Sequence, residues 1–412
     1  MVTPDSRPLW HGRTLALVGI VLLAFSLRSA VASLSPVLDH VAQDFPVPEW
    51  VVGLIGTAPP VCFAIFGVLT PQFERRLGLE RLVVIALAVA TIGMVARGLA
   101  VDGLTLLGST ALIFAAVGTG NVLLPPLVKK YFPDRVGLMT AVFSTTMAVA
   151  TFLPPLVAVP ISDAAGWRTS LALWAVFAGV ALIPWIGLTV RARSAARSEA
   201  DDDDEPRPDV FRRMWRLPLA WALMASFAVS GIIAYTSFAW LPTILVDIAG
   251  VDPATAGALL SLFAGMGLPA SLLVPVLVAR FRIVRSLYAV AVAAGFVSIA
   301  GLLFAPAAAP WLWVALLGIA PLLFPLVLVM LGLRTRTHDA TIALSGFVQS
   351  VGYAITAVFP LTVGLLHAGS GGWTSSLWLL AAVVAAAIPA GVVAARPHTV
   401  EDEWERRHGS WA

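Results

Sequence analysis

The chain has little charge and almost no cysteine. Of its 412 residues, 12% are charged and 59% are apolar, a balance outside that of soluble globular proteins. The single cysteine, Cys62, stands in an apolar run, which leaves no disulfide or cysteine-based metal site. The sequence also has no Gly-rich phosphate loop, no metal-ligand cluster and no nucleophile–base arrangement. ATP-driven transport and enzymatic catalysis therefore have no support, and we expect no cofactor and no metal.

Long apolar runs dominate what is present. A helix needs about 20 apolar residues to cross the hydrocarbon of a bilayer. Twelve runs meet this need, near residues 14–37, 50–70, 82–100, 104–127, 136–160, 168–190, 217–243, 254–279, 286–306, 311–333, 340–366 and 373–395. They are continuously apolar and do not alternate as barrel strands do, so they predict helices. The fold class is therefore an all-α integral membrane protein with twelve transmembrane helices.

The basic residues are confined to alternate gaps between these runs. Of 26 Lys and Arg residues, 23 lie at 7–13, 75–81, 129–135, 191–216, 280–285, 334–336 and 396–407, whereas the other gaps are mainly acidic. Because short basic loops stay in the cytoplasm, both termini are expected inside. The basic residues that raise the pI to 9.4 are therefore expected to contact anionic head groups, and no nucleic-acid surface is implied.

The chain divides into two similar halves. The acidic stretch 201–205 breaks the apolar series and predicts a solvated, partly disordered linker. We therefore expect a six-helix bundle at 1–190, a cytoplasmic linker at 191–216, a second six-helix bundle at 217–396 and a cytoplasmic tail at 397–412.

Three features of the first half recur in the second half, each at nearly the same distance along the sequence. Pro71, Arg76 and Arg81 return as Pro275, Arg280 and Arg285, Asp134 returns as Asp339, and Gly166-Trp167 returns as Gly372-Trp373. Their common order indicates homologous bundles. Parallel repeats of this kind place a substrate site near the middle of the membrane, where the halves meet.

These features resemble the major facilitator superfamily over nearly the whole chain. The loop from Gly67 to Arg81 resembles its signature between spans 2 and 3, with Pro71 where an Asp is usual. Within the superfamily, the segments Leu27-Arg28, Ser35-Pro36, 120–133, Trp240-Leu241-Pro242 and 346–353 are similar to the cyanate permease and 2-nitroimidazole transporter family. The resemblance implies a small-molecule solute moved by alternating access, and we expect a monomer in the cytoplasmic membrane of a bacterium.

Arg28 is the residue most informative about chemistry. It lies near the middle of span 1, where a charged side chain costs about 2.5–3.5 kcal/mol to insert. No Asp, Glu or His lies well inside any span, so a transported anion is the expected partner, held by the planar guanidinium. The alternative is that carbonyl groups of a broken helix or neighbouring amides hold Arg28.

Polar residues of other spans are candidates to assist Arg28 in substrate binding. In the fold that the chain resembles, cavity-facing helices carry Asn121, Tyr235, Trp240, Gln349 and Tyr353. Each of these could equally form an interhelical hydrogen bond, and Trp240 could belong to the outer aromatic belt. Arg97, near the outer end of span 3, is expected to extend its guanidinium to the head groups.

An inner gate is expected from the repeat. Asp134 and Asp339 each begin a helix at the basic side, where a carboxylate is favourable. Arg75 or Arg76 is expected to meet Asp339, and Arg280 or Arg282 to meet Asp134.

The sequence thus predicts a secondary active transporter of a small anionic or polar solute, such as a cyanate-like ion or a small organic acid. One alternative is an exporter of nitroimidazole-like or other small drug-like compounds, and another is a membrane sensor that binds the solute without moving it. The identity of the solute, the direction of transport and any coupling ion are left open.

Overall fold

The computed structural model describes residues 13–195, 208–281 and 283–411, and within them it contains helices and no strand. The first half contains α1 (Thr14–Ser29), η1 (Ser35–Val37), α2 (Leu38–Asp44), α3 (Glu49–Leu77), α4 (Leu79–Gly98), α5 (Gly103–Tyr131), η2 (Pro133–Arg135), α6 (Val136–Ala165), α7 (Trp167–Ala172) and α8 (Trp174–Ala195). The second contains α9 (Pro208–Met214), α10 (Pro218–Ala249), α11 (Pro253–Gly265), α12 (Gly267–Val276), η3 (Leu277–Phe281), α13 (Val284–Phe304), α14 (Pro310–Ile319), η4 (Ala320–Leu322), α15 (Leu323–Leu333), α16 (His338–Ser370), α17 (Thr374–Ala394) and α18 (Val400–His408).

The prediction of an all-α membrane protein is confirmed. Among the described residues, eleven helical stretches are long and apolar enough to cross a membrane. The twelfth apolar run is interrupted, because α1 ends at Ser29 and helix resumes only at Ser35. Non-helical backbone at membrane depth is tolerated only where it is buried in protein or lines a cavity. The break between Ala30 and Leu34 therefore marks a place where other helices must satisfy the backbone.

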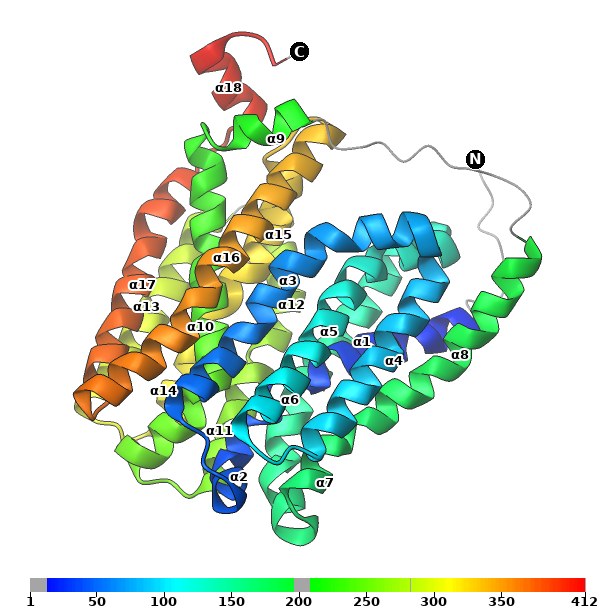
Figure 1. Cartoon of the computed structure of the whole chain (residues 1–412). Coiled ribbons are helices and arrows are strands. Elements are labelled where there is room, and N and C mark those ends of the chain that lie inside the picture. Colours follow the sequence, from blue (N-terminus) through cyan, green and yellow to red (C-terminus); the bar gives the residue numbers. More distant parts are fainter. Residues whose placement is uncertain (1–12, 196–207, 282, 412) are drawn as a thin grey trace.

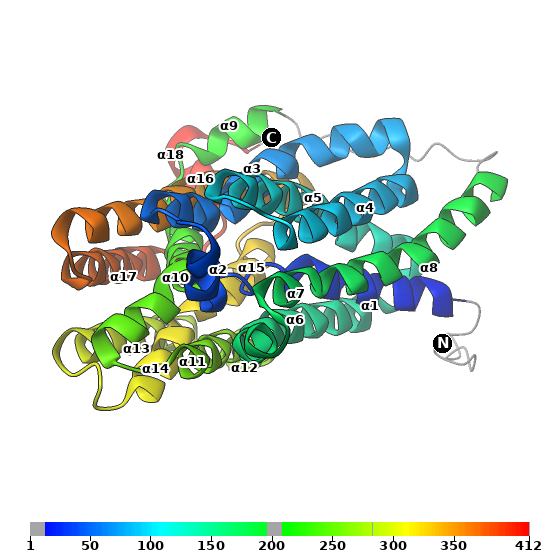
Figure 2. The same cartoon turned by 60° about the horizontal axis from the view of Figure 1, so that its bottom comes forward.

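Two groups of helices face each other. Helices α1 to α8 and α10 to α17 each surround their own apolar core, and the groups meet mainly through α3 with α16 and α6 with α11 (Figures 1 and 2). We call the end that carries the basic loops the basic end and the opposite one the acidic end. The two helices are in contact where Gly53 of α3 meets Leu361 of α16, near the acidic end, and Figure 1 shows them spreading apart toward the basic end, where α9 and α18 lie.

Close contacts seal the acidic end. A Cβ added to Gly53 of α3 would lie 2.9 Å from the Cα of Leu361 on α16, so the two backbones touch there. A Cβ on Gly257 of α11 would similarly lie 2.8 Å from the carbonyl oxygen of Pro155 on α6. Small residues permit this approach of membrane helices.

The sequence repeat appears as a repeated contact at the acidic end. The indole N–H of Trp167 donates to Asp44 at 3.0 Å, and that of Trp373 donates to Asp247 at 2.8 Å. Arg168, the one basic residue of the acidic loops, pairs with Asp44 and lowers the pKa of that carboxyl, together with the Trp167 hydrogen bond. Each pair ties the start of a late helix to an earlier segment of the same half.

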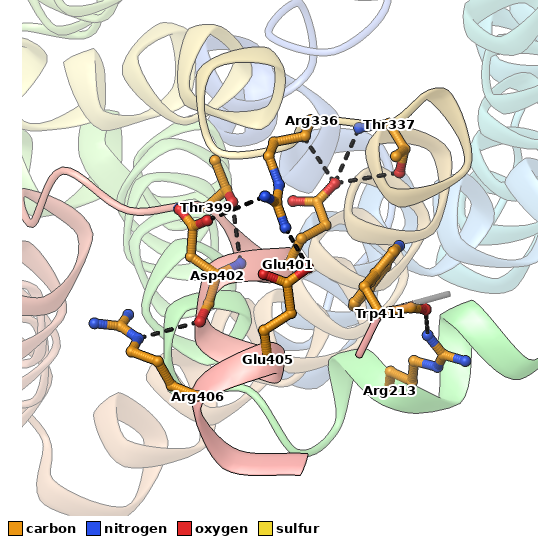
Figure 3. A network of polar contacts seen from close by, with 9 residues as sticks. All are labelled: Arg213, Arg336, Thr337, Thr399, Glu401, Asp402, Glu405, Arg406 and Trp411. Carbon is orange, nitrogen blue, oxygen red and sulfur yellow. Dashed lines mark hydrogen bonds and ion pairs between the residues drawn. The ribbon is translucent and has the colours of Figure 1, made fainter. Parts of the chain in front are cut away.

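The predicted linker and tail are partly helical. α8 extends to Ala195 and α9 begins at Pro208, while the acidic stretch 201–205 lies outside the described residues. In the tail, α18 lies against the basic end of the second half, and the buried carboxylate of Glu401 accepts hydrogen bonds from the backbone N–H groups of Arg336 at 2.7 Å and Thr337 at 3.0 Å (Figure 3). The tail therefore holds the segment directly before α16, which includes the N-cap residue Thr337.

Candidate solute-binding site

Arg28 lies in the last turn of α1, half-buried, directly before the break in span 1. Its guanidinium interacts with the hydroxyl group of Tyr235 on α10, and that hydroxyl interacts in turn with Tyr353 on α16. Among the described residues no ion pair joins Arg28 to a carboxylate. Three of the predicted binding residues thus form one cluster, which we call the Arg28 cluster, at the junction of the two groups of helices.

Aromatic rings enclose the Arg28 cluster. The ring of Phe63, on α3, lies edge-on to Tyr235 with 6.2 Å between centroids and to Tyr353 with 5.7 Å. Phe227, on α10, lies edge-on to Tyr353 at 4.9 Å. Rings at such distances attract each other and shield a polar centre from water. The cluster therefore combines one cation with two hydroxyl groups inside an apolar wall.

The prediction that Arg97 reaches the head groups is wrong. Its side chain is 1% exposed, and it points inward from the last turn of α4. Nη1 donates to the carbonyl oxygen of Ala30 at 3.1 Å, and Nη2 donates to the Ser33 hydroxyl at 2.8 Å. Binding to the carbonyl groups of a broken helix was the alternative considered for Arg28. Arg97 has this role instead, because its N–H groups bond the broken segment of span 1.

A small cavity of about 30 Å³ lies beside the break. Its polar lining comes from Arg97, Ser35, Thr110 and Tyr235, and the remainder is apolar. Because Tyr235 borders both this cavity and the Arg28 cluster, the two are neighbours. The cavity lies on the side of the cluster nearer the acidic end, where Ser35 follows the break and α3 begins.

The other predicted binding residues have different surroundings. Asn121 is half-buried on α5, and it follows Gly120, where an added Cβ would lie 2.4 Å from a methyl carbon of Leu27. Because Leu27 and Gly120 precede Arg28 and Asn121 directly, this contact places Asn121 at about the same depth as Arg28. Gln349 lies one turn before Tyr353 on α16, and its amide donates to the Ser345 hydroxyl at 2.8 Å.

Trp240 is not part of the Arg28 cluster. Its indole N–H donates to the carbonyl oxygen of Pro360 at 2.8 Å, and its ring fills the space beside Gly364. These contacts pack α10 against α16 toward the acidic end. The side chain is 2% exposed, so the alternative of an outer aromatic belt is wrong, whereas the predicted contact of Trp240 with the solute stays a prediction.

Within the described part of the structure, Asp134 does not pair with its predicted gate partner Arg280. Asp134 pairs with Arg13 and with its neighbour Arg135, both in its own half, and the Arg13 hydrogen bond lowers the pKa of the Asp134 carboxyl. The side chains of Arg76 and Arg280 are exposed. Arg282, and the side chains of Arg75 and Asp339, lie outside the described part of the structure.

The prediction missed two buried polar groups. Glu80, at the start of α4, accepts from the Tyr131 hydroxyl at 2.7 Å and pairs with Lys130 at 2.6 Å. Glu403, in α18, accepts from the backbone N–H of Leu219 at 3.0 Å. The spacing of Thr399 and Asp402, which form a capping box, is a sequence signal that could have revealed α18.

Comparisons with known proteins agree with this architecture. The model of the Major Facilitator Superfamily matches residues 20–357. A solved structure of a bacterial homologue of the human lysosomal transporter Spinster, inward-facing and occupied, has a TM-score of 0.70 at 15% identity and covers 97% of this chain and 99% of its own. This likeness shows the fold alone.

Three relatives align with most of the chain. The uncharacterized transporter YycB of Bacillus subtilis is 30% identical over 398 residues and covers 96% of both chains. The 2-nitroimidazole transporter of Escherichia coli is 32% identical, covering 89% of this chain and 91% of its own. The cyanate transport protein CynX of Escherichia coli is 25% identical, covering 87% and 91%.

Proposed function

This chain belongs to the major facilitator superfamily, and we propose that it is a secondary active transporter of a small anionic solute. The observation that carries this proposal is the Arg28 cluster. A guanidinium lies at the junction of the halves beside two tyrosine hydroxyls, and no carboxylate pairs with it among the described residues. An anion with acceptor atoms would supply the missing charge.

The names of two relatives support a small, flat solute. One is named for cyanate, a linear ion, and another for 2-nitroimidazole, a planar ring. A planar solute fits a site whose walls are the rings of Phe63, Tyr235 and Tyr353, because each ring offers a flat apolar face. Export of 2-nitroimidazole-like compounds is the second candidate, and the same aromatic walls favour it.

The orientation follows from the charge zoning. The protein is a multi-pass membrane protein with bacterial transporter homologues, and the cytoplasmic membrane is its proposed location, with the basic end inside. In that orientation the sealed acidic end makes this conformation inward-facing. Closure of the basic end would then allow Asp134 to exchange Arg13 for Arg280 or Arg282, and Asp339 to meet Arg75 or Arg76.

The membrane potential bears on direction. An inside-negative potential opposes entry of an anion by about 2.3 kcal/mol per 100 mV. Uptake therefore needs a co-ion or an exchanged anion, whereas efflux does not. Within this proposal a coupling ion would be needed only for import.

A thermal-stability screen of the purified protein tests the proposal. Cyanate, formate, acetate and 2-nitroimidazole are added at constant ionic strength, since a ligand that binds the folded state raises its stability. We expect at least one anion to raise the melting temperature of the wild type and of Arg212→Ala, an exposed control on α9, but not of Arg28→Ala. An equal shift in a stable Arg28→Ala protein would overturn the anion site. Uptake or efflux of that anion in sealed proteoliposomes separates a carrier from a non-transporting sensor.

A further inference from the structure

Arg97 has hydrogen-bonding capacity beyond the broken helix. A guanidinium has five N–H donors and keeps its charge in proteins. Two of the guanidinium nitrogens bond Ala30 and Ser33, whereas the buried Nε has no partner in the described structure. In the described part of the chain, no carboxylate pairs with this cation. The helix break therefore explains the position of Arg97. It leaves the positive charge without a carboxylate and the Nε–H without an acceptor.

Ser35 presents a second unmatched group in the same place. Its side chain is 8% exposed, and its hydroxyl oxygen has no hydrogen-bond partner in the described structure. Ser35 and Arg97 line the same small cavity, together with the apolar side chains of Phe114 and Ile55. A buried cation, an unpartnered N–H and an unpartnered O–H beside a cavity with apolar walls suit a ligand that brings negative charge and accepts hydrogen bonds.

We propose that Arg97 and Ser35 form a second anion subsite, on the acidic side of the break in span 1. Its ligand is a monovalent anion of only a few atoms, because the cavity of about 30 Å³ holds roughly two or three water-sized groups. This inference rests on the proposed function and deepens it. Tyr235 belongs to the Arg28 cluster and lines this cavity, so the solute would move between Arg97 and Arg28 past the Tyr235 side chain.

Variants of Ser33 and Ser35 distinguish two roles of Arg97, which are anion binding and support of the broken helix. Ser33 accepts a hydrogen bond from Arg97, so Ser33→Ala weakens the hold on the break. Ser35 makes no such bond, so Ser35→Ala removes a donor from the subsite and leaves both bonds of Arg97 in place. If Arg97 only supports the helix, Ser33→Ala alone has an effect.

The test uses bromide, a monovalent anion that accepts hydrogen bonds and is located by anomalous diffraction. Crystals of the full-length wild type soaked in sodium bromide are expected to show one peak beside Arg28 and one between Arg97 and Ser35. Ser35→Ala is expected to lower the second peak severalfold and leave the first unchanged, whereas Ser33→Ala lowers the melting temperature of the bromide-free protein.

The outcomes distinguish the two proposals. A peak beside Arg28 alone overturns the second subsite and leaves the proposed function standing. An unchanged second peak in Ser35→Ala shows an adventitious ion only and also overturns the subsite. Absence of both peaks counts against the anion site at Arg28 as well as the subsite.

Discussion

Arg97, in the last turn of α4, donates a hydrogen bond of 3.1 Å to the carbonyl oxygen of Ala30, at the point where α1 ends. Ala30 is buried, and α1 cannot supply a donor to this carbonyl because the helix stops there. A side chain from another span therefore completes the hydrogen bonding of span 1. This relationship explains how a helix can break at membrane depth.

Removing Arg97 should destabilise the protein without any solute. In Arg97→Ala the Ala30 carbonyl keeps only the longer hydrogen bond of 3.4 Å from the Ser33 hydroxyl, and loss of a partner by a buried acceptor costs about 1–3 kcal/mol. We expect the free energy of unfolding to fall by about this amount. Thermal denaturation measures the change, with Arg81→Ala as control because Arg81 is exposed. Equal melting temperatures for the two variants would show that the contact is unimportant.

The hydroxyl of Tyr235 should contribute to solute affinity. It interacts with Arg28, and Tyr235→Phe removes it while keeping the ring that packs on Phe63. One hydrogen bond contributes about 0.5–1.5 kcal/mol, so affinity should fall about twofold to tenfold. Titration with the anion that most stabilises the wild type measures this loss.

Tyr288→Phe is the matched control for this change. The Tyr288 hydroxyl is also buried, but it bonds Ser226 at 2.7 Å within the second group of helices. A larger loss of affinity in Tyr288→Phe than in Tyr235→Phe would argue against the Arg28 cluster.

The sequence predicted the spans well because the bilayer imposes their length and their apolar character. It predicted Arg28, Tyr235 and Tyr353 as site residues, and these do lie together. It failed for Arg97 because distance from a span end gives depth but not direction, and only the packing of α4 against the broken span shows that the side chain points inward. The alternative of an aromatic belt for Trp240 was wrong for a similar reason, because its hydrogen-bond acceptor, the Pro360 carbonyl, is 120 residues away in the sequence.

The contact between the Glu49 carboxylate and the His367 ring should favour the conformation closed at the acidic end. It joins α3 to α16 across the two groups at 3.7 Å, and both side chains are partly exposed. Such pairs contribute about 0–1 kcal/mol, so Glu49→Gln should shift the conformational balance by less than about fivefold. Spin labels at Val101→Cys and Ala307→Cys, exposed positions in opposite halves, report the separation at this end.

The control for the ion pair is Asp163→Asn. It breaks a pair with His40 of 2.8 Å that lies wholly within the first half. We expect it to leave the label separation unchanged. If both variants widen the distance equally, the effect comes from surface charge and not from a contact between the halves.

The inner gate should be seen by charge exchange. Arg76→Glu and Asp339→Arg should each impair transport, because each leaves like charges opposed when the basic end closes. The double variant restores opposite charges and should recover transport, whereas neither single change should unfold the protein, since exposed pairs contribute only about 0–1 kcal/mol. Transport in proteoliposomes measures the recovery.

Arg280→Glu with Asp134→Arg repeats the test, although reversal at Asp134 also disturbs its pair with Arg13. Failure of both double variants would remove the proposed gate.

The tail helix α18 should stabilise the second half through Glu401. This carboxylate is fully buried and accepts from the backbone N–H groups of Arg336 and Thr337, directly before α16, where the helix dipole also favours negative charge (Figure 3). Hydrogen bonds to charged groups contribute about 1.5–3 kcal/mol, so Glu401→Ala should lower the free energy of unfolding by about that amount.

Glu405→Ala is the control, because the pair of Glu405 with Arg336 is half-exposed and should contribute at most about 1 kcal/mol. Hydrogen exchange of α18 and the first turn of α16 should rise in Glu401→Ala alone. If exchange rises equally in both variants, the surface pairs and not the buried carboxylate hold the tail in place.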